Sequence, residues 1–478
     1  MTANMMQFVS TPQAMPEKRD VTERRRDFGE IHQGFVEEAA SEQAGRCEQC
    51  GIPFCQVHCP LHNNIPDWLR MTAEGRLEEA FELASATNNM PEICGRICPQ
   101  DRLCEGNCVI EKGFESVTIG AVEKHITDTA FARGWVRPPK PLRERSQSIG
   151  VIGAGPAGLA VADQLRKQGY HIDVYDRYDR VGGLLIYGIP NFKLDKDVVK
   201  RRADVLTAGG IRFHLDCEVG ANVSFDDLRA RHEALFIGTG VYKSREIAAP
   251  GVGLTNVVQA LDYLTASNRK GLQDAVPAFD SGALNAAGKR VVVIGGGDTA
   301  MDCVRTAVRQ GATSVQCLYR RDRVNMPGSM REVGHAEEEG VEFVWQAAPE
   351  AFLGDDSVQG VRAVRMRLGA PDATGRQRPE AVPDSSFAIE ADLVIKALGF
   401  DPEDLPTLFG QPELQVSRWG TIRIDWRTMM TPMEGVFAGG DIVRGASLVV
   451  WGVRDGRDAA NGIHSYLHAG APVLALAS

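Results

Sequence analysis

The chain has 478 residues, of which 43% are hydrophobic and 24% charged, and its formal net charge is −10. This length exceeds what one hydrophobic core usually supports, so we expect two to four domains, and the composition excludes a largely disordered chain. The negative charge argues against general binding to nucleic acid or to anionic membranes, both of which need a basic surface.

The N-terminal segment has neither the basic start nor the apolar core of a signal peptide, and no run of 18 apolar residues occurs. We therefore expect a cytoplasmic protein without a membrane segment. In that reducing compartment, clustered cysteines favour metal binding or redox chemistry over disulfides. Eight of the eleven cysteines lie between Cys47 and Cys108. The other three, Cys217, Cys303 and Cys317, stand singly among apolar neighbours and are interpreted as small buried thiols.

The segment from about residue 16 to residue 135 is expected to be helical, because apolar residues such as Ile65, Leu69 and Leu77 recur at helical spacing. It contains no convincing strand. A proline-rich, basic connector, "RGWVRPPKPLRERSQ", follows and indicates an exposed link between domains. We place the first domain at residues 1–145.

The cysteines of this domain form two runs, C-x2-C-x4-C-x3-C-P from Cys47 and C-x3-C-P-x4-C-x3-C from Cys94. Eight thiolates are enough to bind two zinc ions, so two structural zinc sites are the alternative to iron–sulfur clusters. The prolines directly after Cys59 and Cys98, and the nucleotide-binding units that follow, favour iron–sulfur clusters. Counting thiols alone gives two 4Fe-4S clusters with four cysteines each.

The next segment alternates strands and helices and begins with the glycine turn "VIGAGPAGLA". Gly153 permits the tight turn, Gly155 lets the backbone approach a pyrophosphate, and Gly158 allows the helix to pack closely on the strand. Asp176, at the end of the next predicted strand, is placed to accept a hydrogen bond from an adenosine ribose hydroxyl.

A second unit of the same kind carries "GGGDTA", with Gly295, Gly297 and Ala300 at the three turn positions. Its second strand ends in Arg320 and Arg321 where an acid is expected. Guanidinium groups bind a 2′-phosphate that an acid would repel, so the unit is predicted to prefer NADP(H) over NAD(H).

The C-terminal part contains "GVFAGGDIVRG", which predicts a short strand followed by a glycine turn and a helix start at Gly440 and Asp441. A nucleotide with a ribityl chain needs such a second contact. The first unit and the C-terminal part would thus build a discontinuous FAD-binding domain, residues 146–250 and 405–478. The second unit would be an inserted NADPH-binding domain, residues 251–404.

Together with "VGGLLIYGIP", "LFIGTG" and "KALGF", these motifs resemble the flavoprotein family with two dinucleotide domains that includes glutathione reductase and adrenodoxin reductase. The cysteine runs more specifically resemble the small-subunit family of NADPH-dependent glutamate synthase, the N-terminal half of dihydropyrimidine dehydrogenase and the ferredoxin-dependent transhydrogenase large subunit. The fold class is therefore α/β, an all-helical iron–sulfur domain followed by two Rossmann-like domains. The motifs predict these cofactor-binding residues: Gly153, Gly155, Pro156, Ala157, Gly158, Asp176, Gly183, Leu184, Gly240, Gly440 and Asp441 for FAD, and Gly295, Gly297, Asp298, Thr299, Ala300, Arg320 and Arg321 for NADPH.

The resemblance implies that the cluster ligands cross between the two cysteine runs. One 4Fe-4S cluster would take Cys47, Cys50, Cys55 and Cys108, and the other Cys59, Cys98, Cys104 and Glu123. Cys94 would then be spare. The counting of thiols favours Cys94 as the last ligand instead, and an ordinary surface helix position is the alternative for Glu123.

The resemblance also implies a function, with no general acid or nucleophile in this chain. NADPH would reduce FAD, and the clusters would pass electrons singly to a large subunit carrying FMN and an iron–sulfur cluster. That large subunit would make two L-glutamate from L-glutamine and 2-oxoglutarate. Two alternatives stay open: an electron-input subunit for another acceptor, as in the transhydrogenase or a pyrimidine reductase, and a zinc-stabilised nucleotide sensor without turnover.

Overall fold

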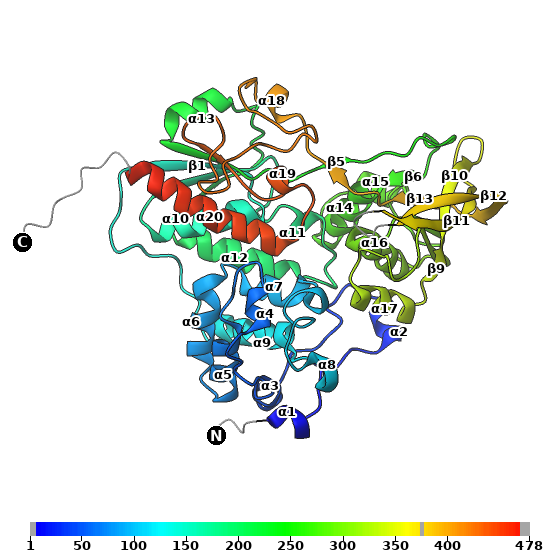
Figure 1. The fold of residues 1–478 in the computed structure, drawn as a ribbon. Coiled ribbons are helices and arrows are strands. Elements are labelled where there is room, and N and C mark those ends of the chain that lie inside the picture. Colours follow the sequence, from blue (N-terminus) through cyan, green and yellow to red (C-terminus); the bar gives the residue numbers. More distant parts are fainter. Residues whose placement is uncertain (1–5, 373–376, 469–478) are drawn as a thin grey trace, which may run out of the picture.

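The computed structural model describes residues 6–372 and 377–468, and Figure 1 shows a helical part, in blue, beside two sheet-containing parts. The two large sheets have the strand orders β15-β4-β1-β2-β3 and β6-β13-β7-β8-β9, and every neighbouring pair in them is parallel. The predicted fold class is confirmed: an all-helical N-terminal domain precedes two Rossmann-like α/β units.

The helical part is built from short helices, and no strand is assigned among its described residues before Ser148. Trp68, Leu69, Val122 and Ile126 lie at the centre of its apolar core and are almost fully buried. In chain order its helices are α1 (Gln7–Ser10), α2 (Val21–Arg24), α3 (Glu37–Ala44), α4 (Phe54–Val57), α5 (Ile65–Ala73), α6 (Leu77–Thr87), α7 (Pro91–Ile97), the 3-10 helix η1 (Gln100–Arg102), α8 (Glu111–Phe114) and α9 (Ile119–Ala132).

Helices α7 and α9 touch backbone to backbone at Gly95. A Cβ atom added to Gly95 would lie 2.8 Å from the backbone nitrogen of Lys124 and 2.9 Å from the carbonyl oxygen of Gly120, so a side chain here would push the helices apart. This close approach brings Cys94 of α7, and Cys98 just after it, next to α9.

The first sheet is completed by a strand from far along the chain. Its strands are β1 (Ser148–Ile152), β2 (His171–Tyr175), β3 (Arg212–His214), β4 (Ala234–Ile237) and β15 (Val436–Ala438). The last of these pairs with β4, with Phe437 opposite Phe236. The C-terminal part therefore belongs to the first sheet.

Small residues allow α10 (Pro156–Lys167) and α20 (Val449–His468) to lie side by side over this sheet (Figure 1). A Cβ atom on Gly456 would lie 2.4 Å from the carbonyl oxygen of Ala157 and 2.8 Å from Cβ of Ala160. This contact holds the C-terminal helix against the helix that follows the first glycine turn.

The second sheet consists of β6 (Val257–Gln259), β7 (Arg290–Ile294), β8 (Ser314–Tyr319), β9 (Glu342–Trp345) and β13 (Leu393–Lys396). A three-stranded antiparallel sheet extends it, with β10 (Ala347–Leu353), β11 (Gly360–Pro371) and β12 (Gln377–Glu390). The chain enters and leaves this region through one antiparallel pair, β5 (Lys243–Ser244) and β14 (Phe400–Asp401).

The remaining helices cover the two sheets. They are α11 (Leu184–Tyr187), α12 (Lys196–Ala208), α13 (Phe225–Arg231), α14 (Ala260–Gly271), α15 (Pro277–Asp280), α16 (Asp298–Arg309), α17 (Met330–Glu338), α18 (Leu405–Leu408) and α19 (Asp441–Arg444). Among the described residues, no helix is both long and apolar enough to cross a membrane.

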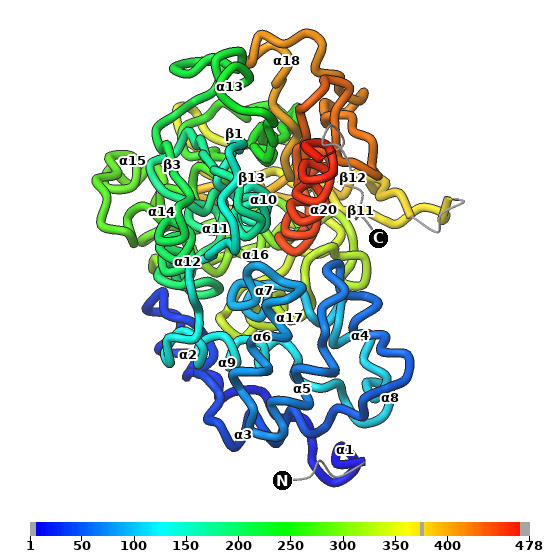
Figure 2. Tube along the Cα trace, turned by 90° about the vertical axis from the view of Figure 1, so that its left-hand side faces the viewer, coloured from blue at the N-terminus to red at the C-terminus, as the bar shows by residue number. Residues whose placement is uncertain are grey.

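Figure 2 shows the helical part filling one end of the molecule, beneath the helices of the first sheet. The two parts share one apolar core, in which Met90 and Ile93 of the helical part pack in the same cluster as Val161 and Leu165 of α10. The helical part that contains the cysteine runs therefore packs directly against the first Rossmann-like unit.

Candidate cofactor sites

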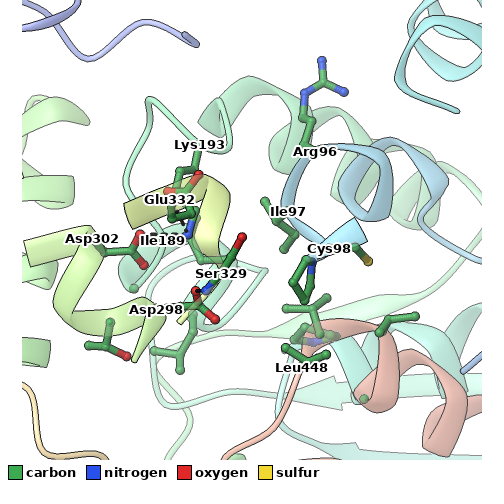
Figure 3. Close-up of a pocket in the computed structure, with 18 of the residues that line it drawn as sticks. Arg96, Ile97, Cys98, Ile189, Lys193, Asp298, Asp302, Ser329, Glu332 and Leu448 are labelled. Atoms are coloured by element: carbon green, nitrogen blue, oxygen red, sulfur yellow. Dashed lines mark hydrogen bonds and ion pairs between the residues drawn. The ribbon is translucent and has the colours of Figure 1, made fainter. Parts of the chain in front are cut away.

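One large cavity lies where the helical part and both sheets meet. It is lined by Gly153 and Asp176 from the first unit, Asp298 from the second unit, Asp441 from the C-terminal part, and Cys98 from the helical part. Figure 3 shows Cys98 close to Leu448, with Asp298 and Ser329 on the opposite side of the opening. Residues far apart in the sequence thus line one cavity.

The first glycine turn has the geometry that its sequence predicts. Gly153 has φ +106°, and a Cβ atom there would lie 2.4 Å from the carbonyl oxygen of Gly238. A Cβ atom on Gly158 would lie 1.9 Å from the carbonyl oxygen of Gly153, so the third glycine allows α10 to pack on the turn. Around Gly155 that space is open, and this residue lines the cavity at the N-terminus of α10.

Asp176 follows β2 and lies at the wall of the cavity. Its carboxylate accepts hydrogen bonds from the backbone N–H of Ala154 at 2.6 Å and of Tyr178 at 2.9 Å. Burial raises the pKa of this carboxyl. A carboxylate has about four acceptor positions, so these two bonds leave capacity for a ligand hydroxyl.

Asp441 is the first residue of α19 and lines the same cavity. Burial raises its pKa to about 7. The preceding turn is held from below, because the backbone N–H of Gly440 donates to the buried Asp455 at 2.9 Å and Arg444 pairs with the same carboxylate at 2.7 Å. Asp441 itself therefore stays directed at the cavity.

The predicted residues divide into those that line the large cavity and those that lie outside its lining. Gly183, with φ +55°, stacks its backbone on Gly155, since a Cβ atom would lie 3.0 Å from Cα of Gly155. The predicted residues that line the cavity are Gly153, Gly155, Pro156, Ala157, Asp176, Leu184, Gly240, Asp298, Thr299, Gly440 and Asp441. Those outside its lining are Gly158, Gly183, Gly295, Gly297, Ala300, Arg320 and Arg321.

The second glycine turn repeats the geometry of the first. Gly295 has φ +152°, and a Cβ atom on it would lie 2.3 Å from the carbonyl oxygen of Ala397. The space next to Gly297 is open, and Ala300 is fully buried in α16. The start of α16 at Asp298 thus has the form of a helix N-terminus that binds phosphate through its first backbone N–H groups.

Arg320 and Arg321 follow β8, at the strand end where a nucleotide ribose is expected. Arg320 is exposed, and Nε of the half-buried Arg321 has no hydrogen-bond partner. The ion pairs found among the described residues include that of Arg323 with Glu337 but none for Arg320 or Arg321. Their charge is therefore available to an anionic ligand.

Two smaller cavities in the helical part divide the thiols into two groups. The first is lined by Cys47, Cys50, Cys55 and Cys108, together with apolar residues such as Leu69. Burial raises the pKa of Cys47 to about 11 and that of Cys55 to about 12. This is the group that the resemblance assigns to one cluster.

The second small cavity is lined by Cys59, Cys94, Cys98, Cys104 and Glu123. Burial raises the pKa of Cys59 to about 11 and that of the Cys104 thiol well above its usual value. Both candidates for the last ligand, the thiol and the carboxylate, face this one space. The cavity alone does not choose between them.

Glu123 is not a surface residue, since only 7% of it is exposed. Its Oε1 accepts hydrogen bonds from the side-chain amides of Asn63 at 3.0 Å and Asn88 at 3.3 Å, and burial raises its pKa to about 8. The amide oxygen of Asn88 in turn accepts from the Cys94 thiol at 3.8 Å. The interpretation of Glu123 as an ordinary exposed helix position is therefore wrong.

Within the described residues, no three His, Cys, Asp or Glu side chains are spaced to hold a single metal ion. The thiolates of a 4Fe-4S cluster bind different iron atoms and so stand further apart than the ligands of one ion. The fit of the helical part to such a cluster lies in the chemistry of its donors: each cavity is mostly apolar and groups four or more thiol or carboxylate side chains.

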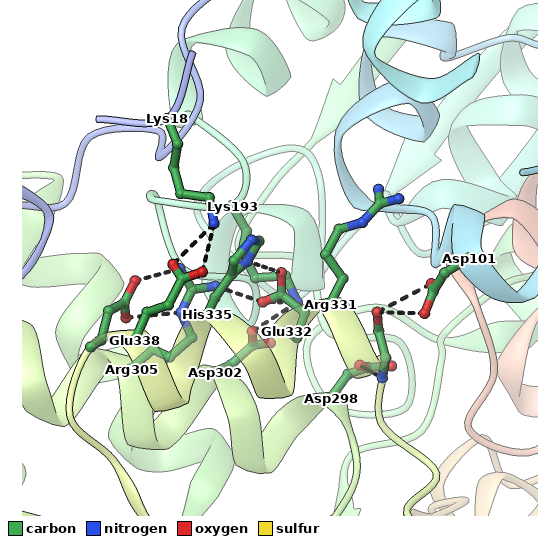
Figure 4. A network of polar contacts seen from close by, with 12 residues as sticks. Lys18, Asp101, Lys193, Asp298, Asp302, Arg305, Arg331, Glu332, His335 and Glu338 are labelled. Atoms are coloured by element: carbon green, nitrogen blue, oxygen red, sulfur yellow. Dashed lines mark hydrogen bonds and ion pairs between the residues drawn. The ribbon is translucent and has the colours of Figure 1, made fainter. Parts of the chain in front are cut away.

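A network of charged side chains at the large cavity could not be predicted from a sequence motif. Lys193 pairs with Asp302 at 2.9 Å and lies 3.7 Å from Glu332, joining the first unit to the second. Burial acts to lower the pKa of Lys193, but the two carboxylates outweigh it and raise that pKa. Figure 4 shows the network continuing from Glu332 of α17 to Arg305 of α16, which pairs with it at 2.6 Å. These residues come from separate segments, so no local motif predicts them.

Two family models match the chain. The model described as dihydropyrimidine dehydrogenase domain II, 4Fe-4S cluster, covers residues 24–135, and the model described as pyridine nucleotide-disulphide oxidoreductase covers residues 147–456. Among solved structures, FprA of Mycobacterium tuberculosis in complex with NADPH has a TM-score of 0.57 at 18% identity, over 68% of this chain and 85% of that one. This last likeness supports the α/β fold.

Curated relatives match over nearly the whole chain. The "Glutamate synthase [NADPH] small chain" of Azospirillum brasilense is 66% identical over 466 residues, 97% of either chain. The protein of the same name from Escherichia coli K12 is 45% identical over 472 residues, 98% of this chain and all of that one. The chain therefore belongs to the family of glutamate synthase small chains, which are NADPH-dependent FAD and iron–sulfur oxidoreductases.

Proposed function

We propose that this chain is the electron-input subunit of a glutamate synthase. It would oxidise NADPH at FAD and pass the electrons through two 4Fe-4S clusters to a large chain that makes L-glutamate from L-glutamine and 2-oxoglutarate. The observation that carries this proposal is the large cavity, because Gly155 of the first turn, Asp298 just after the second turn and Cys98 all line it. The family assignment supports the identity of the acceptor.

When bound, FAD accepts a hydride as two electrons and can release them one at a time to iron–sulfur clusters. The residues of this chain would hold and orient the groups. The open backbone at Gly155 and at Gly297 gives each pyrophosphate access to a helix N-terminus. Asp176 and Asp441 would accept hydrogen bonds from hydroxyl groups of FAD, and Arg320 with Arg321 would bind the 2′-phosphate of NADPH. No side chain needs to act as a general acid or nucleophile.

The three cavities form a series, which supports an order of electron flow. The second thiol cavity shares Cys98, Gln100 and Val450 with the large cavity, whereas the first thiol cavity shares none of its lining with it. The two thiol cavities have Ile119 as a common wall. We propose that electrons enter at Cys59, Cys98 and Cys104 and leave from the first thiol cavity toward the large chain.

The large chain would carry FMN and an iron–sulfur cluster of its own, and the complex would work in the cytoplasm. We propose domain boundaries at residues 145/146, 250/251 and 404/405. The strand membership of the two sheets and the β5–β14 pair that lies between them support this proposal.

An assay of the purified chain tests the function. With NADPH it should reduce ferricyanide, and anaerobic preparations should contain about eight iron and about eight acid-labile sulfide per chain. No glutamate should form until the large chain is added. Zinc without sulfide would refute the iron–sulfur clusters. Glutamate formation by this chain alone would refute the proposal that the large chain carries out that reaction.

The retention of FAD should depend on Asp441. Asp441→Ala removes a hydrogen-bonding carboxyl group, and the loss of such a bond costs about 1–3 kcal/mol, so FAD should bind about fivefold to a hundredfold more weakly. The flavin-to-protein absorbance ratio after gel filtration measures this. Asp227→Ala, which removes an exposed carboxylate from α13, is the matched control and should retain its flavin. Equal retention in the two variants would contradict the role of Asp441.

A further inference from the structure

The residues just before α17 contact the second nucleotide turn on one side. The backbone N–H of Gly328 donates to the carbonyl oxygen of Gly296 at 3.0 Å, and that of Ser329 donates to Oδ1 of Asp298 at 3.0 Å. On the other side the Ser329 hydroxyl donates to the Asp101 carboxylate, with distances of 3.2 and 3.3 Å to its two oxygens. This segment thus joins the nucleotide unit to the helical part.

Arg331, the second residue of α17, extends the same junction. Its Nη2 donates to Oε2 of Glu105 at 2.7 Å and its Nη1 donates to Oε1 of Gln100 at 3.1 Å. Figure 4 shows Arg331 extending from α17 toward the helical part, on the side where Asp101 lies. A cation of the second nucleotide unit is thereby held against the part that contains the thiols.

Glu105 lies in a position where its charge matters. Its side chain is only 3% exposed, and its other oxygen, Oε1, accepts from the backbone N–H of Gly120 at 3.0 Å. It directly follows Cys104, and Gln100, the second partner of Arg331, lines the same small cavity as Cys104. Among the ion pairs of the described residues, that of Glu105 is with Arg331.

We propose that Arg331 is a positioning residue that neutralises Glu105 beside the second thiol cavity and so sets the reduction potential of the cluster bound there. The inference rests on the proposed second cluster. Taking up one electron from the reduced flavin makes a cluster more negative, and a buried unpaired carboxylate next to it opposes that step. The second nucleotide unit thus influences the reduction potential of this cluster, although it provides none of the predicted cluster ligands.

The experiment is a redox titration of the full chain followed by electron paramagnetic resonance, which reports the potential of the second cluster without any turnover. Arg331→Ala should shift this potential to a more negative value, and Glu105→Gln should shift it to a more positive one. The double variant Arg331→Ala/Glu105→Gln should return close to the wild-type value, since no unpaired charge is left. If Arg331 only supported the structure, removing the charge of Glu105 as well would not return the potential to the wild-type value.

The matched control is Arg102→Ala. Arg102 also crosses the junction, donating to the carbonyl oxygen of Pro327 at 2.5 Å, but it is exposed and leaves no buried carboxylate behind. In Arg102→Ala the reduction potential of the second cluster should stay at the wild-type value. An unchanged potential in Arg331→Ala, or a double variant shifted as far as Arg331→Ala, would overturn the inference alone. A wild-type chain without a second cluster signal would overturn both the inference and the proposed cluster count.

Discussion

Replacing Glu123 by alanine is expected to remove the second iron–sulfur cluster, whereas replacing Cys94 by alanine is expected to leave it in place. Iron should fall from about eight to about four atoms per chain in Glu123→Ala and stay near eight in Cys94→Ala. NADPH-dependent reduction of the large chain should be lost with the cluster. The reduction of ferricyanide can persist if the dye takes electrons from the flavin directly.

The geometry favours the carboxylate over the thiol. Asn63 and Asn88 both donate to Oε1 of Glu123, so the side chain is fixed in the cavity with its second oxygen left for iron. The Cys94 thiol instead donates to the amide oxygen of Asn88 at 3.8 Å and is also hydrogen-bonded with the Cys98 thiol. Two buried amides thus hold a carboxyl group in place beside the thiols, which is an arrangement expected around a ligand rather than a chance buried acid.

Iron and sulfide analysis together with the cluster spectrum measures the outcome. Glu123→Cys is the informative third variant, because a thiolate in this position should keep the cluster and change its spectrum. Full iron content in Glu123→Ala combined with loss in Cys94→Ala would assign the ligand to Cys94 and would restore the simple count of eight thiols.

The glycine turns and the strand–helix order were predictable from the sequence because they are local. A residue such as Gly153 or Gly295 is required by the backbone conformation of its own segment, with φ values that other residues avoid. The grouping of the thiols was not predictable from spacing. It depends on where Cys108 and Glu123 return in space, and only the family resemblance suggested a division. The linings of the two cavities separate the same thiols but add Cys94 to the second group.

The pairs that cross between domains could not be predicted at all. Lys193 with Asp302, and Arg331 with Glu105, join residues that the sequence places far apart, and a single charged residue in a polar sequence carries no signal of its partner. The amides of Asn63 and Asn88 were missed for the same reason. The contacts between distant residues that position the site side chains and adjust their charge were therefore not predicted from the sequence.

The preference for NADPH over NADH is expected to depend on Arg320 and Arg321. Each charge-assisted hydrogen bond to the 2′-phosphate is worth about 1.5–3 kcal/mol, so replacing both arginines by alanine should raise the KM for NADPH about 100-fold or more. The KM for NADH should change by less than about threefold on the same reasoning, because NADH has no phosphate at this position.

Steady-state assays with both nucleotides and one dye give the ratio of the two kcat/KM values, which cancels any general damage to the enzyme. Arg323→Ala is the matched control. It removes an arginine from the same turn, but one that is exposed and already paired with Glu337, so the ratio should remain that of the wild type. If Arg320→Ala/Arg321→Ala weakens NADPH and NADH equally, the arginines support the turn and the 2′-phosphate is bound elsewhere. A selective loss of NADPH binding assigns that phosphate to the two arginines that follow β8.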